Sequence, residues 1–274
     1  MFQTNYLRHW HKRRLPKVMS WDRQINLKTA AEIAIMREAG RINAEALQAA
    51  TAIIKPGVTT ADLNAAAEEV LKKHGVYSPF KGYPGRYPYP ASICTSVNEE
   101  LVHGIPGKRK LKAGDIVSMD CGTVYKGYVG DSAVTIGVGE ISESARKLLE
   151  VTEEALRIGI KQMVGGKHVG DIGAAIQDFV ERNKMNVVRE YTGHGVGRQM
   201  HEGPAVPNYG IPGKGMELRI GMTIALEPMV MLGSYFTRVT PDEWTVASRD
   251  GALTAHFEHS VAITENGPVI LTEL

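Results

Sequence analysis

The sequence predicts an α/β fold in which a unit of two helices followed by β-strands occurs twice. Two observations lead to this prediction. The apolar face of one candidate helix recurs at a constant shift of 109, from position 63 to position 172. The residue pairs related by this shift include Leu63 and Ile172, Gly57 and Gly166, Asp62 and Asp171, and Glu45 and Glu154. A strand that ends in Asp120 also recurs, at a shift of 107, as a strand that ends in Glu227. Helical periodicity alone is common, so the matching glycine, acidic and strand positions are what favour a duplication.

The duplication divides the chain into halves at about 26–137 and 138–274, after a basic extension at 1–25. In such a pseudo-two-fold domain the strands of both halves form one central sheet. The symmetry axis should then bring Asp120 and Glu227 together.

Capping and stop signals place the first two helices. Thr29 and Glu32 form a capping box, which predicts a helix from Thr29 to about Ile54 that Pro56–Gly57 ends. The next helix carries its apolar face over residues 63–71 and ends near Gly75.

Two acidic residues close adjacent apolar runs. Asp120 ends IVSMD, and Asp131 lies in YVGDSAVTI, one tight turn later. If Lys126–Gly127 forms the turn, Asp131 lies diagonal to Asp120 on the same face of the hairpin; if Tyr125–Lys126 forms it, the two are directly opposite. Either arrangement brings like charges together and favours a bound cation or a shared proton.

The amino-acid composition limits the class of protein to which the chain can belong. The chain has 274 residues, 43% of them hydrophobic and 23% charged, as in ordinary globular proteins. A net charge of +2 does not indicate a nucleic-acid binder. Two cysteines without a CxxC pair predict reduced thiols and a cytoplasmic protein. No apolar stretch approaches the length of a membrane span, so no membrane partner is expected.

The first 17 residues contain five basic and no acidic side chains. A solvated, partly disordered tail is the favoured interpretation. An electrostatic tether to RNA and an organelle transit peptide are the alternatives, and the scarcity of serine weakens the second.

Further metal-ligand types occur in the second half. Glu227 precedes Pro228 at a strand end, Glu258 lies in the apolar run HFEHSVAI, and His194 lies among three glycines that disfavour a helix. Together with Asp120 and Asp131 they carry a formal charge of minus four, which two divalent cations balance. Such a ligand set suits Co, Mn, Fe(II) or Zn, and paired metals of this kind occur in aminopeptidases. His103 and His201 are candidates to bind a substrate and to stabilise an oxyanion beside that centre.

The quoted residues resemble a known family, the type I methionine aminopeptidases, over about residues 26–274. The resemblance is carried by the segments YPASICTSVNEELVHGIPG, GDIVSMDCGTVYKGYVGDSAVT, GHGVGRQMHEGPAV, GMTIALEPM and FEHSVAIT. It implies the pita-bread fold, with a curved, mainly antiparallel sheet. It also implies metal ligation by Asp120, Asp131, His194, Glu227 and Glu258.

The resemblance further implies that His103 and His201 contact the substrate. By position, the methionine pocket includes Tyr89, Cys94 and Trp244. Met200 stands where related enzymes often carry an aromatic residue, and the YPGRYPYP stretch also departs from the pattern.

The implied activity is removal of the initiator methionine from nascent polypeptides that have a small second residue. We expect Glu227 to accept a proton from the attacking water, His201 to stabilise the oxyanion, and His103 to hydrogen-bond the scissile amide. The expected partners are nascent chain ends and, through the basic tail, the ribosome; the expected state is a monomer.

Two alternatives differ in class from this enzyme. An X-Pro dipeptidase or aminopeptidase P has a similar five-ligand centre but usually an additional large N-terminal domain, whereas about two dozen residues precede the first helix here. A metal-free RNA- or ribosome-binding relative should have lost ligands, and all five are present.

Overall fold

The computed structural model describes residues 25–274. The expected extension at 1–25, with its basic residues and its expected ribosome contact, lies outside the described residues apart from residue 25. None of the helices in the described part of the chain combines the length and the hydropathy needed to cross a membrane.

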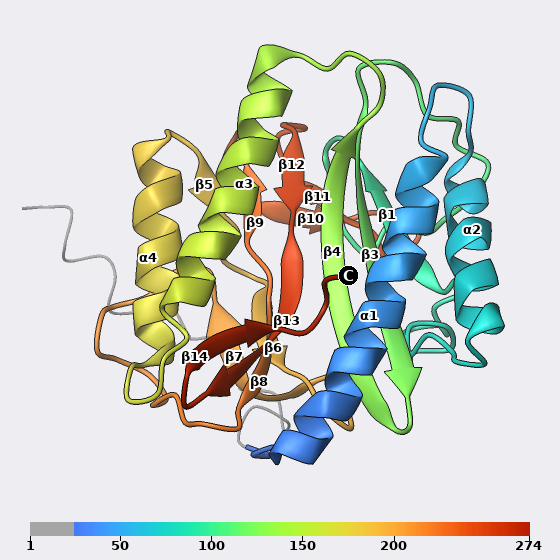
Figure 1. The fold of residues 1–274 in the computed structure, drawn as a ribbon. Coiled ribbons are helices and arrows are strands. Elements are labelled where there is room, and N and C mark those ends of the chain that lie inside the picture. The colour runs from blue at the N-terminus through green and yellow to red at the C-terminus, as the bar shows by residue number, and fades with distance from the viewer. Residues whose placement is uncertain (1–24) are drawn as a thin grey trace, which may run out of the picture.

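Four helices lie against one face of a curved sheet (Figure 1). They are α1 (Ala30–Ala52), α2 (Thr60–Lys73), α3 (Glu143–Lys161) and α4 (Val169–Arg182). The first pair covers the half of the sheet built from the N-terminal repeat, and the second pair covers the other half. The first helix begins as predicted, with the Thr29–Glu32 capping box, and ends at Ala52, two residues before the predicted end.

The large sheet has eight strands, and all of its pairings are antiparallel. Its strands are β1 (Ile93–Val97), β3 (Ile116–Tyr125), β4 (Tyr128–Gly137), β13 (Glu258–Thr264), β8 (Thr223–Leu226), β6 (Thr192–Gly195) and β7 (Glu202–Pro207), in that spatial order, with β14 (Gly267–Ile270) paired to β13. The order β1-β3-β4 in the first half is mirrored by β6-β8-β13 in the second. The pseudo-two-fold axis therefore passes between β4 and β13, and the predicted fold class is confirmed.

The repeat extends to backbone detail. The two 14-residue helices α2 and α4 start 109 positions apart, at 60 and 169. Gly57 and Gly166 both have positive φ, 94° and 87°, and so do Gly114 and Gly221, 93° and 89°. L-residues with a side chain rarely adopt this conformation, so glycine is required at the same turns in both halves.

Two smaller sheets accompany the large sheet, and one of them contacts α3 and α4. One contains β10 (Thr237–Val239), β11 (Val246–Ser248) and β2 (Glu100–Val102), and the other contains β12 (Thr254–His256), β9 (Met229–Met231) and β5 (Asn186–Val187).

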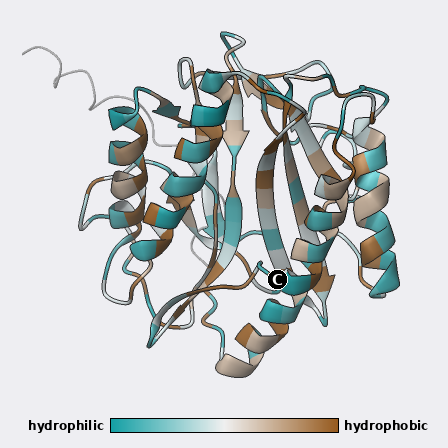
Figure 2. Cartoon of the chain, turned by 45° about the horizontal axis from the view of Figure 1, so that its top comes forward, coloured by the Kyte–Doolittle hydropathy of each residue, from teal (hydrophilic) through white to brown (hydrophobic). Residues whose placement is uncertain are grey.

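Each half has its own apolar core between helices and sheet, and Figure 2 shows the apolar stripes of the helices. The contact between α1 and β4 is unusually close. A Cβ atom at Gly130 would lie 2.6 Å from the backbone nitrogen of Gly40. Glycine at position 130 lets α1 rest on the β3–β4 hairpin directly behind Asp131, and glycine at position 40 makes room for the backbone of Leu271.

Candidate active site

The β3–β4 hairpin fixes the first two acids. Tyr125 pairs with Tyr128 across a turn at Lys126–Gly127, whose φ values are 47° and 77°. This is the first of the two predicted turns, and it places Asp131 opposite Gly122 and diagonal to Asp120 on one face. Like-charged carboxylates are thus held side by side by the register of a regular hairpin.

The other two acids join them through the central strand pairings. Glu258 and Asp120 both pair with Ala133 of β4, from opposite sides. Glu227 directly follows Leu226, the partner of His259 in β13. Three adjacent strands and the end of a fourth therefore carry their acids to one region of the sheet, on both sides of the pseudo-two-fold axis.

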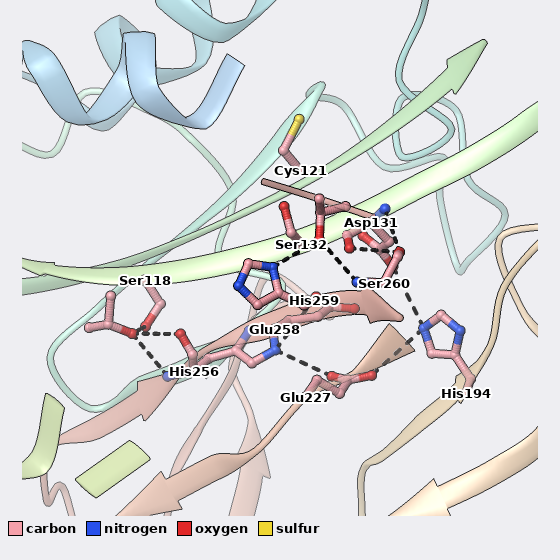
Figure 3. A network of polar contacts seen from close by, with 12 residues as sticks. Ser118, Cys121, Asp131, Ser132, His194, Glu227, His256, Glu258, His259 and Ser260 are labelled. Carbon is pink, nitrogen blue, oxygen red and sulfur yellow. Dashed lines mark hydrogen bonds and ion pairs between the residues drawn. The ribbon is translucent and has the colours of Figure 1, made fainter. Parts of the chain in front are cut away.

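His194 lies between the two halves of this acidic group (Figure 3). Its Nε2 atom is 3.7 Å from Asp131 Oδ2 and 3.7 Å from Glu227 Oε1. Asp131, His194 and Glu258 offer ligand atoms that all lie within 4.8 Å of one another, and all three residues are buried. A cation could therefore contact residues of both halves at once.

Backbone and hydroxyl contacts hold the acids in place. Ser260 Oγ donates to the carbonyl of Asp131 at 2.9 Å and accepts from its N–H at 3.0 Å. Asn43 of α1 donates to the carbonyl of Gly130 at 3.0 Å from the helix side. Asn208 donates to the carbonyl of Glu227, also at 3.0 Å. These bonds hold the backbone that carries the Asp131 and Glu227 carboxylates.

The acids need a positive partner. Burial raises the pKa of each of Asp120, Asp131, Glu227 and Glu258 well above its ordinary value, and neighbouring carboxylates raise that of Asp120 further. Asp120 Oδ1, Asp131 Oδ1 and Glu258 Oε1 are buried oxygens without a hydrogen-bond partner. Such atoms are rare in folded proteins. The donor set, hard oxygens with one imidazole, fits divalent metal ions.

The imidazoles around the acids are neutral at neutral pH. Burial lowers the pKa of His194 to about 3 and those of His103 and His201 to about 4. A neutral imidazole can ligate a metal or donate a hydrogen bond without adding charge. His103 has a φ of 61°, a left-handed conformation that is uncommon outside glycine and clusters at functional sites.

His201 is held by a residue of the other half. Tyr83 Oη lies 2.8 Å from His201 Nδ1, with the two rings edge to face at 5.5 Å between centroids. The rings of His201 and His194 are 4.3 Å apart. The glycines beside His194 allow this crowding, since a Cβ at Gly195 would lie 2.1 Å from the carbonyl oxygen of Gly203.

A cavity of about 140 Å³ opens onto the acids. All eleven residues that the sequence singled out line it: Tyr89, Cys94, His103, Asp120, Asp131, His194, Met200, His201, Glu227, Trp244 and Glu258. Its apolar wall is built mainly of Tyr89 and Trp244, whose rings pack edge to face at 5.2 Å. Tyr89 is fixed by its hydroxyl, which donates to the carbonyl of Gly104 at 2.9 Å.

Sequence reasoning missed three residues of the site. Phe80 and Tyr83 also line the cavity, and His256 lies within 4 Å of both Glu227 and Glu258. The signal for His256 was present, because residues two apart in a strand share a face and Glu258 is two residues later. Tyr83 lies in the YPGRYPYP stretch, for which no strand or helix pattern gave a position.

Comparisons with known proteins agree with this geometry. Residues 34–265 match metallopeptidase family M24. The chain is 51% identical to a methionine aminopeptidase of Clostridium acetobutylicum over 90% of this chain and 98% of that protein, and 52% identical to methionine aminopeptidase 1 of Bacillus subtilis with the same coverage of both chains. The crystal structure of a methionine aminopeptidase from Thermotoga maritima superposes with a TM-score of 0.89 at 49% identity, covering 91% of this chain and all of that one.

A prolidase from Pyrococcus furiosus superposes less well. Its TM-score is 0.70 at 24% identity, and the match covers 90% of this chain but 65% of the prolidase. That likeness extends to the fold alone. The chain therefore belongs to metallopeptidase family M24 and, within it, to the methionine aminopeptidases.

Proposed function

We propose that this protein removes the initiator methionine from nascent polypeptides with a small second residue, by hydrolysis at a dinuclear metal centre in the cytoplasm. One observation carries the proposal: the four acids and His194 line a cavity whose remaining wall is largely aromatic and sulfur-containing. At about 140 Å³ the cavity is smaller than the roughly 300–1,000 Å³ pockets that take drug-sized ligands. It suits one terminal side chain rather than the interior of a peptide.

The five residues that would hold the two metal ions are Asp120, Asp131, His194, Glu227 and Glu258. When bound, such a metal pair lowers the pKa of a water and polarises a carbonyl. Reloading the metal-free protein with Co, Mn, Fe(II) or Zn, one at a time, identifies the ions that support activity.

Glu227 is the proposed proton acceptor. Its side chain is 12% exposed, the most open of the three acids that contact an imidazole, so it can face a water in the cavity. Burial raises its pKa, which suits a group that takes a proton from water and passes it to the leaving amine.

His201 and His103 are the proposed substrate contacts. If Tyr83 donates to Nδ1 of His201, the imidazole proton is on Nε2, where it can donate to a developing oxyanion. His103 would hydrogen-bond the scissile amide.

The methionine side chain would lie against Tyr89, Cys94, Met200 and Trp244. A thioether interacts favourably with aromatic edges, and an unbranched thioether in the wall can adapt to it. Met200 therefore contacts the substrate side chain by adapting its own conformation, whereas an aromatic residue would contact it with a rigid ring.

Hydrolysis of a panel of Met-X peptides by metal-free protein, reloaded with one metal at a time, tests the proposal. We expect cleavage of Met-Ala-Ser, little cleavage when the second residue is bulky, and none of X-Pro peptides. Asp131→Asn should require a higher metal concentration for half-maximal rate. X-Pro cleavage in preference to Met-Ala would overturn the substrate assignment, and full activity of the metal-free protein would overturn the metal centre.

A further inference from the structure

We propose that His256 is a positioning residue of the site: its imidazole Nε2 faces the carboxylates of Glu227 and Glu258, and its interaction with Glu227 fixes the direction in which Glu227 faces the cavity. The inference rests on the proposed function only in its kinetic consequence. The geometry that carries it is independent of the substrate.

The imidazole of His256 is directed at the two acids. Its Nε2 atom lies 3.4 Å from Glu227 Oε2 and 3.8 Å from Glu258 Oε2. The side chain is 2% exposed, and Nε2 has no hydrogen-bond partner among the described residues, so its contacts with the two carboxylates are ion-pair contacts rather than formed hydrogen bonds. An isolated buried polar atom is destabilising, so its placement between two carboxylates calls for an interaction with them.

The backbone of His256 is hydrogen-bonded to Thr135 of the first half of the molecule. Thr135 Oγ1 donates to its carbonyl at 2.8 Å and accepts from its N–H at 2.9 Å. The single hydroxyl proton of Thr135 is then used, so Ser118 Oγ, 2.8 Å away, must be the donor of the contact between the two hydroxyls. Figure 3 shows this chain of contacts reaching Glu227 through His256.

Imidazoles thus alternate with acids across the site. His194 lies between Asp131 and Glu227, and His256 lies between Glu227 and Glu258. The two oxygens of Glu227 consequently face different rings, Oε1 towards His194 and Oε2 towards His256. A neutral N–H donor at Oε2 leaves Oε1 directed at the cavity and lessens the repulsion between the two glutamates without adding a charge.

Two amide substitutions separate this role from simple space filling. In His256→Gln the side-chain amide reaches about as far as Nε2, whereas in His256→Asn it reaches only about as far as Nδ1. The measurements are kcat and KM on Met-Ala-Ser and, without substrate, the affinity for Mn²⁺ by titration calorimetry of metal-free protein.

For His256→Asn we expect kcat to fall about 10- to 100-fold with KM within threefold, and Mn²⁺ affinity to fall about 10-fold, the range found when partners of metal ligands are removed. In His256→Gln, kcat and Mn²⁺ affinity should both lie close to the wild-type values. His259→Asn is the matched control: His259 contacts Thr272 Oγ1 through Nδ1 at 2.9 Å, which the asparagine amide can still reach, and it does not line the cavity, so kcat should stay near the wild-type value.

A folded His256→Asn with wild-type kcat and Mn²⁺ affinity would overturn the proposal, and so would a His256→Gln variant as impaired as Asn. If Asn fails to fold, a 100-fold loss of kcat in folded Gln still overturns it. If the wild-type protein cleaves no Met-X peptide, the proposed function fails. A Mn²⁺ affinity that is lower in His256→Asn than in His256→Gln would still support the role of His256.

Discussion

The two halves of the molecule share a backbone plan but differ in the side chains they bring to the site. Each half supplies two acids, Asp120 and Asp131 from the first and Glu227 and Glu258 from the second. The imidazoles are unequally divided. The second half supplies three of them, His194, His201 and His256, and the first half supplies His103.

This difference separates two tasks. Acids related by the pseudo-two-fold axis are suited to holding a pair of cations, which is itself a nearly symmetric arrangement. Proton transfer and oxyanion stabilisation act on one side of a substrate, so they need an asymmetric set of groups. The apolar wall is also unequally divided: Phe80, Tyr83, Tyr89 and Cys94 come from the first half, and Met200 and Trp244 come from the second. Four predictions test this division, from the largest expected effect to the smallest.

Glu227→Gln should lower kcat by about 10²–10⁴-fold, the usual contribution of a general acid–base group. The amide keeps the size of the side chain but cannot accept a proton. The measurement is steady-state hydrolysis of Met-Ala-Ser at saturating metal.

Its symmetry counterpart is the control. Asp120→Asn should mainly raise the metal concentration needed for activity, and kcat at saturating metal should recover more than in Glu227→Gln. Equal losses of kcat in both variants at saturating metal would mean that the two acids have equivalent roles and that the division of tasks is wrong.

Much of this site could be predicted because it depends on regular structure. Asp120 and Asp131 occupy a hairpin whose register follows from one turn, and Glu227 follows from the repeat. Tyr83 could not be placed, because its loop is fixed by distant contacts: Trp244 Nε1 donates to the carbonyl of Tyr87, and the Trp244 ring packs on Gly85. His256 could have been inferred from its place two residues before Glu258 in the run HFEHSVAI, which the structure divides into β12, ending at His256, and β13.

Metal removal should make stability depend on pH in a defined direction. The four acids of the metal-free protein have raised pKa values, so these carboxyl groups bind more protons in the folded state than in the unfolded state above about pH 4. Unfolding then releases protons, and the free energy of unfolding should fall as pH rises. In urea denaturation we expect this fall between about pH 7.5 and pH 8.5, where the histidines are neutral in both states. At lower pH the buried His103, His194 and His201, whose pKa values burial lowers, make stability rise with pH and oppose the acids.

Metal-loaded protein is the control, because bound cations replace the protons. Loading with Mn²⁺ at pH 6 should release protons to the buffer and flatten the pH dependence. A metal-free protein that becomes more stable from about pH 7.5 to pH 8.5 would contradict the assignment of raised pKa values to acids of both halves.

Tyr83→Phe should lower kcat about tenfold with little change in KM, since removing one hydrogen bond that orients a catalytic group costs roughly 1.4 kcal/mol. The substitution removes the contact by which the first half fixes His201 of the second. Tyr87→Phe is the matched control, because its hydroxyl donates to the carbonyl of Asp242 outside the cavity. Equal kcat values for the two variants would show that the Tyr83 hydroxyl does not orient His201.

The smallest effect compares the helix caps of the two halves. At the start of α2, Thr59 Oγ1 accepts from the N–H of Asp62 at 3.2 Å, so Thr59→Ala should cost about 1 kcal/mol of unfolding free energy. At the matching start of α4, the His168 side chain makes no cap hydrogen bond, and its backbone N–H donates to Asp171 at 2.7 Å. His168→Ala leaves that bond intact and should cost a few tenths of a kcal/mol.

Urea denaturation of both variants measures the difference, and an equal or larger loss at His168 would mean that the imidazole caps α4 as effectively as the threonine caps α2. The expected inequality would show that the duplicated backbone is retained while its side-chain contacts diverge, as the imidazoles do at the site.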